Sequence, residues 1–124
     1  MSTTQENSGI PASAVEAAPG LWRTNVQRFD LSVPGREMIQ ARVDIEPTSP
    51  PIRHYHPGEE IIYVLEGSLE YTVDGQGTKV CHAGDGLTVP TGVIHAVRNV
   101  GTGIATELAT YIVEKGKPLL VVAQ

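Results

Sequence analysis

The stretch HYHPGEE at residues 54–60 constrains this chain more than any other part of its sequence. Successive side chains of a β-strand point to opposite faces, so His54, His56 and Glu60 share one face if the stretch is extended. Two imidazoles and a carboxylate on one face can converge on one metal ion, with bonds of about 2.0–2.2 Å. The apolar run Ile61–Leu65 has the β-branched and aromatic composition of a strand. The stretch therefore predicts a strand that carries metal ligands.

A second stretch, residues 84–99, complements the first. Leu87–Val89 is typical of a short strand, Pro90-Thr91-Gly92 of a tight turn, and Ile94–Asn99 of a returning strand. His95 lies near the start of that returning strand. We expect it to complete the ligand set that His54, His56 and Glu60 begin.

Two neighbouring residues compete with this assignment. Glu59 has the opposite parity to the two histidines and should be exposed, unless Pro57-Gly58 forms a bulge that shifts the register. His82 precedes Ala83-Gly84 and is typical of a surface or turn histidine. We therefore predict Glu60 as the carboxylate ligand and leave His82 out of the metal ligand set.

These stretches resemble the two sequence motifs of the cupins. The first motif is matched by His54, His56, Glu60 and Gly67, with Thr48 in place of its leading glycine, and the second is matched at every position by Gly84, Pro90, Gly92, His95 and Asn99. The resemblance covers Met38 to Val113. It implies an all-β fold, the cupin-type double-stranded β-helix or jelly-roll barrel, in which three histidines and one glutamate hold a divalent metal. Because one pair of motifs is present, it implies a single barrel.

The remaining sequence fits one small β-domain. A length of 124 residues favours one domain, and 13 glycines and 9 prolines favour turns and strands over helices. Residues 1–19 are polar and poor in apolar side chains, which predicts a flexible N-terminal arm, and residues 20–124 form the predicted barrel domain.

Further strands follow from alternation and turn signals. Met38–Ile45 alternates, with the odd-numbered side chains predicted inside and the even-numbered ones, Gln40 and Arg42 among them, predicted to face solvent. Ser68–Val73 is expected to pair with the strand before it and, through a turn at residues 74–77, with Thr78–His82. We also expect edge strands within Leu21–Leu31, a long strand at Ile104–Val113 and a last short strand at Leu119–Ala123.

Composition limits the partners and the location. A net charge of −5 argues against nucleic acid or an anionic membrane as partner, and no window of 18 apolar residues is present. The single cysteine, Cys81, excludes an internal disulfide and is expected to be a small buried side chain. Without a recognisable signal peptide, the expected location is the cytoplasm. Uncovered sheet edges and the cupin resemblance predict a homodimer, with contacts around Trp22 or Leu119–Val122.

The expected function is metal-dependent chemistry on a small molecule. The resemblance is closest to small quercetin-dioxygenase-like cupins, which implies one divalent ion per chain (Fe, Mn, Ni, Co, Cu or Zn), dioxygenase-type chemistry, and Glu60 as a catalytic base as well as a ligand. Two alternatives stay open: a metal-dependent lyase or isomerase of a small hydroxy, keto or sugar acid, and a non-catalytic metal- and ligand-binding protein. Beyond the ligands, the candidates for an inward acid or base are Tyr63, His82 and Arg42.

Overall fold

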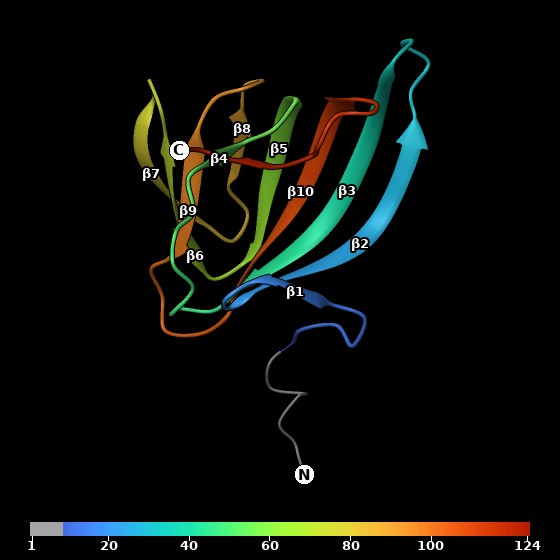
Figure 1. The fold of residues 1–124 in the computed structure, drawn as a ribbon. Helices are drawn as coiled ribbons and strands as arrows, with labels where there is room; N and C mark the ends of the chain where they lie inside the picture. The colour runs from blue at the N-terminus through green and yellow to red at the C-terminus, as the bar shows by residue number, and fades with distance from the viewer. Residues whose placement is uncertain (1–8) are drawn as a thin grey trace.

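The computed structural model describes residues 9–124, and all of the regular structure in that range is β-strand (Figure 1). No helix that could span a membrane is found in this part of the chain. The strands are β1 (Val15–Ala18), β2 (Leu21–Asp30), β3 (Arg36–Ile45), β4 (His54–Tyr55), β5 (Gly58–Glu66), β6 (Ser68–Val73), β7 (Gly77–His82), β8 (Gly86–Val89), β9 (His95–Asn99), β10 (Ala105–Glu114) and β11 (Val121–Val122).

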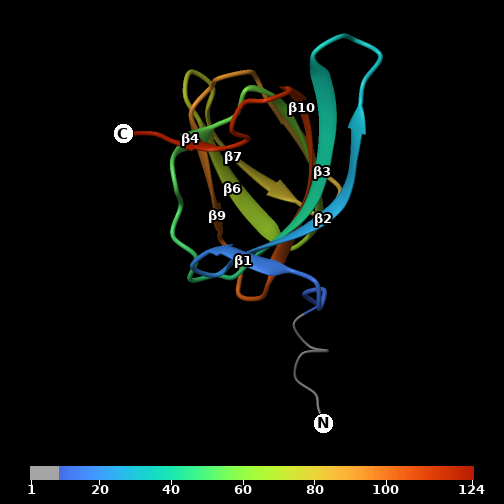
Figure 2. The ribbon, with the colours of Figure 1, turned by 45° about the vertical axis from the view of Figure 1, so that its right-hand side comes forward.

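Two antiparallel sheets face each other and form the barrel (Figures 1 and 2). One sheet has the order β1-β2-β3-β10-β5-β8, and the other has the order β11-β4-β9-β6-β7. This is the all-β, jelly-roll architecture that the sequence predicts. The strand order also alternates between early and late segments, so residues distant in sequence meet inside the barrel.

The expected pairing of Ser68–Val73 with the strand before it is wrong. Strand β6 pairs with β7, as expected, but its other neighbour is β9, whereas β5 pairs with β10 and β8 in the opposite sheet. The chain changes sheets at Gly67, which has a φ of +79° and where an added Cβ would lie 2.8 Å from the Cβ of Ala105. Glycine is therefore required here for both its backbone conformation and its lack of a side chain.

Gly58 shows a second close approach, at the start of the ligand-bearing strand. A Cβ on Gly58 would lie 1.8 Å from the carbonyl oxygen of Ile112 in β10. Only glycine lets β5 pair this closely with β10, and this pairing places Glu60 opposite Tyr111. Gly58 thus sets the position of the strand that carries Glu60.

The core lies between the sheets and follows the predicted alternation. In β5 the even-numbered residues from Gly58 to Val64 are buried and the odd-numbered ones are exposed. In β3, Ala41, Val43 and Ile45 are buried as expected, and Cys81 is fully buried. Asp44 lies on the even-numbered face of β3, which was predicted to face solvent. Its side chain is instead buried and accepts a hydrogen bond of 2.7 Å from Thr106 Oγ1.

The N-terminal segment is partly ordered within the range expected to be a flexible arm. Residues 15–18 form β1, which pairs with β2, so β2 lies between β1 and β3 rather than at an edge. Residues 1–8 lie outside the described residues. The domain boundary expected at residue 20 therefore stays a prediction.

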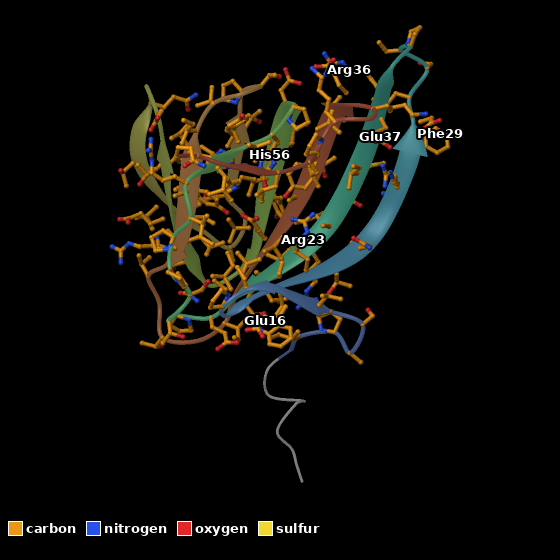
Figure 3. All side chains as sticks on the ribbon, in the orientation of Figure 1. Glu16, Arg23, Phe29, Arg36, Glu37 and His56 are labelled. Carbon is orange, nitrogen blue, oxygen red and sulfur yellow. The ribbon has the colours of Figure 1, made fainter. Side chains whose placement is uncertain are left out.

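The last strand pairs within the barrel, whereas the connection between β2 and β3 projects from it (Figures 1 and 2). Strand β11 pairs with β4 at the edge of the smaller sheet, as expected for the last strand. Strands β2 and β3 extend past the rest of the barrel, so that their connection stands apart (Figures 1 and 2). Phe29 lies near that connection and is 66% exposed (Figure 3).

Candidate metal centre

Four side chains predicted as ligands come together inside the barrel. The ligand atoms of His54, His56, Glu60 and His95 all lie within 4.8 Å of one another. His54 of β4 is paired with His95 of β9 in one sheet, whereas Glu60 reaches the cluster from β5 in the other. The cluster therefore joins both sheets. The first motif alone contributes His54 from one sheet and Glu60 from the other.

Backbone carbonyls fix the orientation of all three imidazole rings. The Nδ1 atoms of His54, His56 and His95 lie 2.7, 2.8 and 3.0 Å from the carbonyl oxygens of Ile52, Leu119 and Val93. A carbonyl oxygen can only accept, so each Nδ1 carries the hydrogen and donates it. In a neutral imidazole the Nε2 atom is then a bare lone pair, which is the arrangement of metal-ligating histidines.

The cluster contains more acceptors than donors. Oxygen Oε1 of Glu60 lies 3.0 Å from Nε2 of His95 and 3.1 Å from Nε2 of His56. The His56 Nε2 is buried and makes no hydrogen bond of acceptable geometry with residues 9–124, despite that short distance. Lone pairs that face a carboxylate repel unless a cation lies between them. Three nitrogens and one oxygen are a donor set that transition metals prefer, so these residues fit a divalent ion.

The ionisation of the cluster agrees with this fit. Burial lowers the pKa of His54 to about 4, so its imidazole is neutral at neutral pH. Burial opposes ionisation of Glu60, but the close approach of the His56 and His95 imidazoles to its carboxylate outweighs burial and lowers the pKa of Glu60. For His95, burial favours the neutral ring, yet the Glu60 carboxylate prevails and raises its pKa. Without metal, a proton on His95 supplies the positive charge that Glu60 requires.

The competing residues lie where the sequence places them. Glu59 is exposed and Glu60 is 3% exposed, so residues 57–58 do not shift the register. His82 is exposed and its Nδ1 lies 2.8 Å from the Ser68 hydroxyl, away from the cluster. Glu60 therefore lies in the cluster with the three histidines, whereas Glu59 and His82 lie outside it, and the ligand assignment stays a prediction.

Asn99, the last residue of the second motif, has a structural role. Its side-chain amide donates to the carbonyl oxygens of Ile45 and Gly103, at 2.8 and 2.7 Å, and its Oδ1 accepts from the backbone N–H of Gly101 at 2.8 Å. Asn99 thus ties the end of β9 to β3 and to the loop that leads into β10. This keeps the strand that carries His95 in place.

A cavity of about 180 Å³ opens beside the cluster. His54, Glu60 and His95 line one part of it, and apolar side chains such as Val43, Ile62 and Val97 form much of its wall. The remaining polar lining residues are Arg23, Tyr71, Glu107 and Tyr111. A small molecule in this cavity would therefore contact both the cluster and these four polar side chains.

Sequence reasoning missed these four polar residues and named others. Tyr63 is 49% exposed and His82 is exposed, while Arg42 pairs with Asp44 outside the cavity. None of the three is an inward acid or base, because each has the parity of an outward face.

The alternation of buried and exposed residues along β10 and β6 could have identified three of the four residues. Glu107 and Tyr111 share the parity of Ala105, Ala109 and Val113 in β10, and Tyr71 shares that of Leu69 and Val73 in β6. A glutamate on the apolar face of a strand is unusual, and that pattern could have identified Glu107. Arg23 had no comparable signal, because β2 is mostly exposed.

The missed residues form two hydrogen-bonded pairs. The Tyr71 hydroxyl donates to Glu107 Oε1 at 2.5 Å, and Arg23 Nη1 donates to the Tyr111 hydroxyl at 3.1 Å. Burial, followed by the negative charge of Glu60, raises the pKa of Glu107 to about 8. Burial likewise raises the pKa values of Tyr71 and Tyr111. At neutral pH these groups are thus a neutral carboxylic acid and two phenols.

Comparisons with known proteins agree with the fold and the motifs. The Cupin_2 family, described as a cupin domain, matches residues 41–113. Germin-like protein 1-1 of Oryza sativa subsp. japonica is 33% identical over 109 residues, which cover 84% of this chain and 45% of that protein. Polyketide synthase CurC of Streptomyces cyaneus is 49% identical over 49 residues, or 39% of this chain and 31% of that protein. The chain thus spans under half the length of these curated relatives.

A solved structure supports the same architecture. A cupin-like protein of Thermotoga maritima superimposes with a TM-score of 0.67 at 18% identity, over 83% of this chain and 75% of that protein. At this level of identity the likeness concerns the fold.

Proposed function

Since this chain belongs to the cupin family, as a family match over more than half of its length shows, we propose that it is a metal-dependent enzyme that acts on a small organic molecule. The proposed ligands are His54, His56, Glu60 and His95, and the proposed chemistry is of the dioxygenase type. One observation carries the proposal: three imidazoles with bare Nε2 atoms and one carboxylate converge beside a cavity. When bound there, a divalent ion supplies Lewis acidity and coordination positions for substrate oxygen atoms.

The protein's own residues supply proton transfer. Glu60 is ionised and lines the cavity, so its second carboxylate oxygen is placed to accept a proton from a bound substrate. Glu107 is protonated at neutral pH and lines the same cavity, so it is placed to donate one. Two carboxyl groups with separated pKa values are a common acid and base pair.

The cavity restricts the size of the substrate and the access of water. A volume of about 180 Å³ is below the 300–1,000 Å³ that is typical of pockets for drug-sized ligands. Apolar walls exclude water and strengthen the electrostatic interactions of the polar groups among them. The proposed substrate is therefore small, well below the size of a flavonol.

A second candidate is metal-dependent lyase or isomerase chemistry on a small hydroxy, keto or sugar acid. The observation that favours it is that Glu107, with a raised pKa, and Glu60, with a lowered pKa, line the same cavity, because proton addition and removal within one cavity need no oxidant. A binding protein without turnover uses the same cluster and is the remaining alternative.

The test begins with elemental analysis of protein that has been purified without added metal. We expect close to one divalent transition metal ion per chain. Oxygen uptake is then screened with that metal restored, using small hydroxy and keto acids and small enols. Oxygen consumption supports the dioxygenase, product formation without oxygen consumption supports the lyase or isomerase, and ligand binding without turnover supports the binding protein. Protein that takes up no metal contradicts all three.

We also propose a homodimer in the cytoplasm. Support for association comes from the exposed apolar side chains Phe29, Ile61, Tyr63 and Leu65, and the free thiol of Cys81 fits a reducing compartment. Light scattering over a wide concentration range tests the dimer, and a monomer mass throughout contradicts it.

A further inference from the structure

Arg23 is the one arginine or lysine among the residues that line the cavity. It comes from β2, is half-buried, and lies outside both sequence motifs (Figure 3). Four other arginines form ion pairs with carboxylates: Arg28 with Glu37, Arg42 with Asp44, Arg53 with Asp74 and Arg98 with Glu70. Within residues 9–124, Arg23 has no carboxylate oxygen within the 4.0 Å of an ion pair.

The partners that Arg23 does have are uncharged. Its Nη1 donates to the Tyr111 hydroxyl, and its guanidinium carbon lies 5.5 Å from the centre of the Tyr111 ring. A guanidinium has five N–H donors, so most of its donors are not used by this contact. Glu107 shares the cavity, but its carboxyl group accepts a hydrogen bond from Tyr71 and forms no ion pair with Arg23 among residues 9–124.

Tyr111 relates Arg23 to the metal centre. Its ring lies edge-on against the His56 ring, with centroids 4.8 Å apart, while its hydroxyl accepts the hydrogen bond from Arg23. The guanidinium and the His56 ring of the cluster therefore both contact the side chain of Tyr111. A small molecule with two oxygen-bearing groups a few carbon atoms apart is suited to contact both.

We propose that this cavity binds a small carboxylate, with its carboxylate group on Arg23 and a second oxygen-bearing group at the cluster of His54, His56, Glu60 and His95. The inference rests on the proposed metal centre and names the substrate class for it. A planar guanidinium forms paired, charge-assisted hydrogen bonds with a carboxylate. A divalent ion and Arg23 together exceed the charge of Glu60, so the site has an excess of positive charge that an acidic ligand balances.

Succinate is the probe, because its two carboxylates are separated by two carbon atoms. Succinamate is the matched control ligand, in which an amide of nearly the same shape replaces one carboxylate. Binding of each to Mn²⁺-loaded protein is measured by titration calorimetry, with the manganese content determined beforehand. The protein variants are Arg23→Gln, Arg23→Lys and, as a control with the same change of charge on the outer surface, Arg98→Gln.

We expect succinate to bind the wild-type protein, and Arg23→Gln to weaken it at least about tenfold, which is 1.4 kcal/mol. The preference for succinate over succinamate should disappear in Arg23→Gln, because an amide places no charge opposite the guanidinium. Arg23→Lys should restore part of the affinity, and Arg98→Gln should match the wild type. Manganese content should stay the same in all of these proteins.

Two results overturn the inference. One is that succinate does not bind to manganese-loaded wild-type protein at millimolar concentrations. The other is equal affinity in Arg23→Gln and Arg98→Gln, which would leave Arg23 as a support for the Tyr111 ring alone. Failure of the proposed function is seen separately, as absence of bound manganese in the wild-type protein before any ligand is added.

Discussion

Two glutamates are buried in the same cavity, and their surroundings place them in opposite states. Glu60 is 3% exposed and Glu107 is 4% exposed, so burial alone does not distinguish them. Glu60 contacts two imidazoles, which lower its pKa, whereas Glu107 contacts a phenol and experiences the charge of Glu60, so its pKa is raised to about 8. The nature of the neighbouring groups, rather than depth, decides which carboxyl group is ionised.

The same comparison separates two parts of the cavity. The part around Glu60 is a set of acceptors without enough donors, as a metal centre requires. The part around Glu107 consists of two hydrogen-bonded pairs, Tyr71 with Glu107 and Arg23 with Tyr111, in which most donors of Arg23 are left for a ligand. Changes at the first part should therefore act on metal, and changes at the second on folding stability and ligand.

The largest expected effect is loss of metal from His95→Ala. Removal of groups that only orient a ligand costs about 10–100-fold in metal affinity, so loss of a direct ligand should exceed that range. Metal affinity is measured by competition with a chelator. Glu59→Gln is the matched control, because Glu59 is exposed beside Glu60 and should leave the affinity unchanged. Equal affinities in the two variants would place the metal elsewhere.

The next effect is a fall in metal affinity with acid. Metal needs neutral imidazoles and an ionised carboxylate, so protons compete with it. The pKa of His95 is raised and that of His54 is about 4, so competition near neutral pH falls on His95 rather than on His54. Affinity should fall by up to about tenfold per pH unit as the pH drops through the pKa of His95, which is raised above its ordinary value of about 6.5.

By linkage, the stability that metal adds is present above that pKa and is lost below it. Titrations between pH 5 and 8, together with the chelator-sensitive part of the melting temperature, check both statements. An affinity that is flat across this window would contradict ligation by histidine.

Tyr71→Phe tests the other part of the cavity. The substitution keeps the buried ring but removes the donor to Glu107, so a buried acceptor loses its partner. We expect the free energy of unfolding to fall by about 1–3 kcal/mol, with metal affinity unchanged. Urea unfolding and the chelator competition measure the two quantities. A variant that loses metal but keeps its stability would show that the two parts of the cavity are not separate.

The most gradual expected effect, spread over several pH units, is the pH dependence that Glu107 adds to the metal-free protein. Its folded pKa is raised above the unfolded value, so between about pH 4.5 and 8 the folded state holds a proton that the unfolded state does not. Wild-type stability should therefore fall relative to that of Glu107→Gln as the pH rises through this window, by about 1.4 kcal/mol per pH unit at most. Urea unfolding at several pH values in the presence of chelator gives the difference. A constant difference would mean that Glu107 is ionised throughout.

The cluster of His54, His56, Glu60 and His95 and the class of fold could both be predicted from the sequence. Alternation places His54, His56 and Glu60 on one face and Glu59 on the other, because the direction of a side chain along a strand depends only on its place in that strand. Pro90-Thr91-Gly92 likewise predicts the turn that returns the chain to His95. These features are local, and the structure agrees with them.

Tertiary structure alone decided which strands became neighbours and what they enclose. Gly67 moves the chain from one sheet to the other, so Ser68–Val73 pairs with a strand much later in the chain. Arg23, Tyr71 and Glu107 come from three strands, and no spacing in the sequence relates them. Their meeting depends on the closure of the two sheets, which many long-range contacts decide together. The cluster could therefore be predicted from the sequence, whereas the cavity beside it could not.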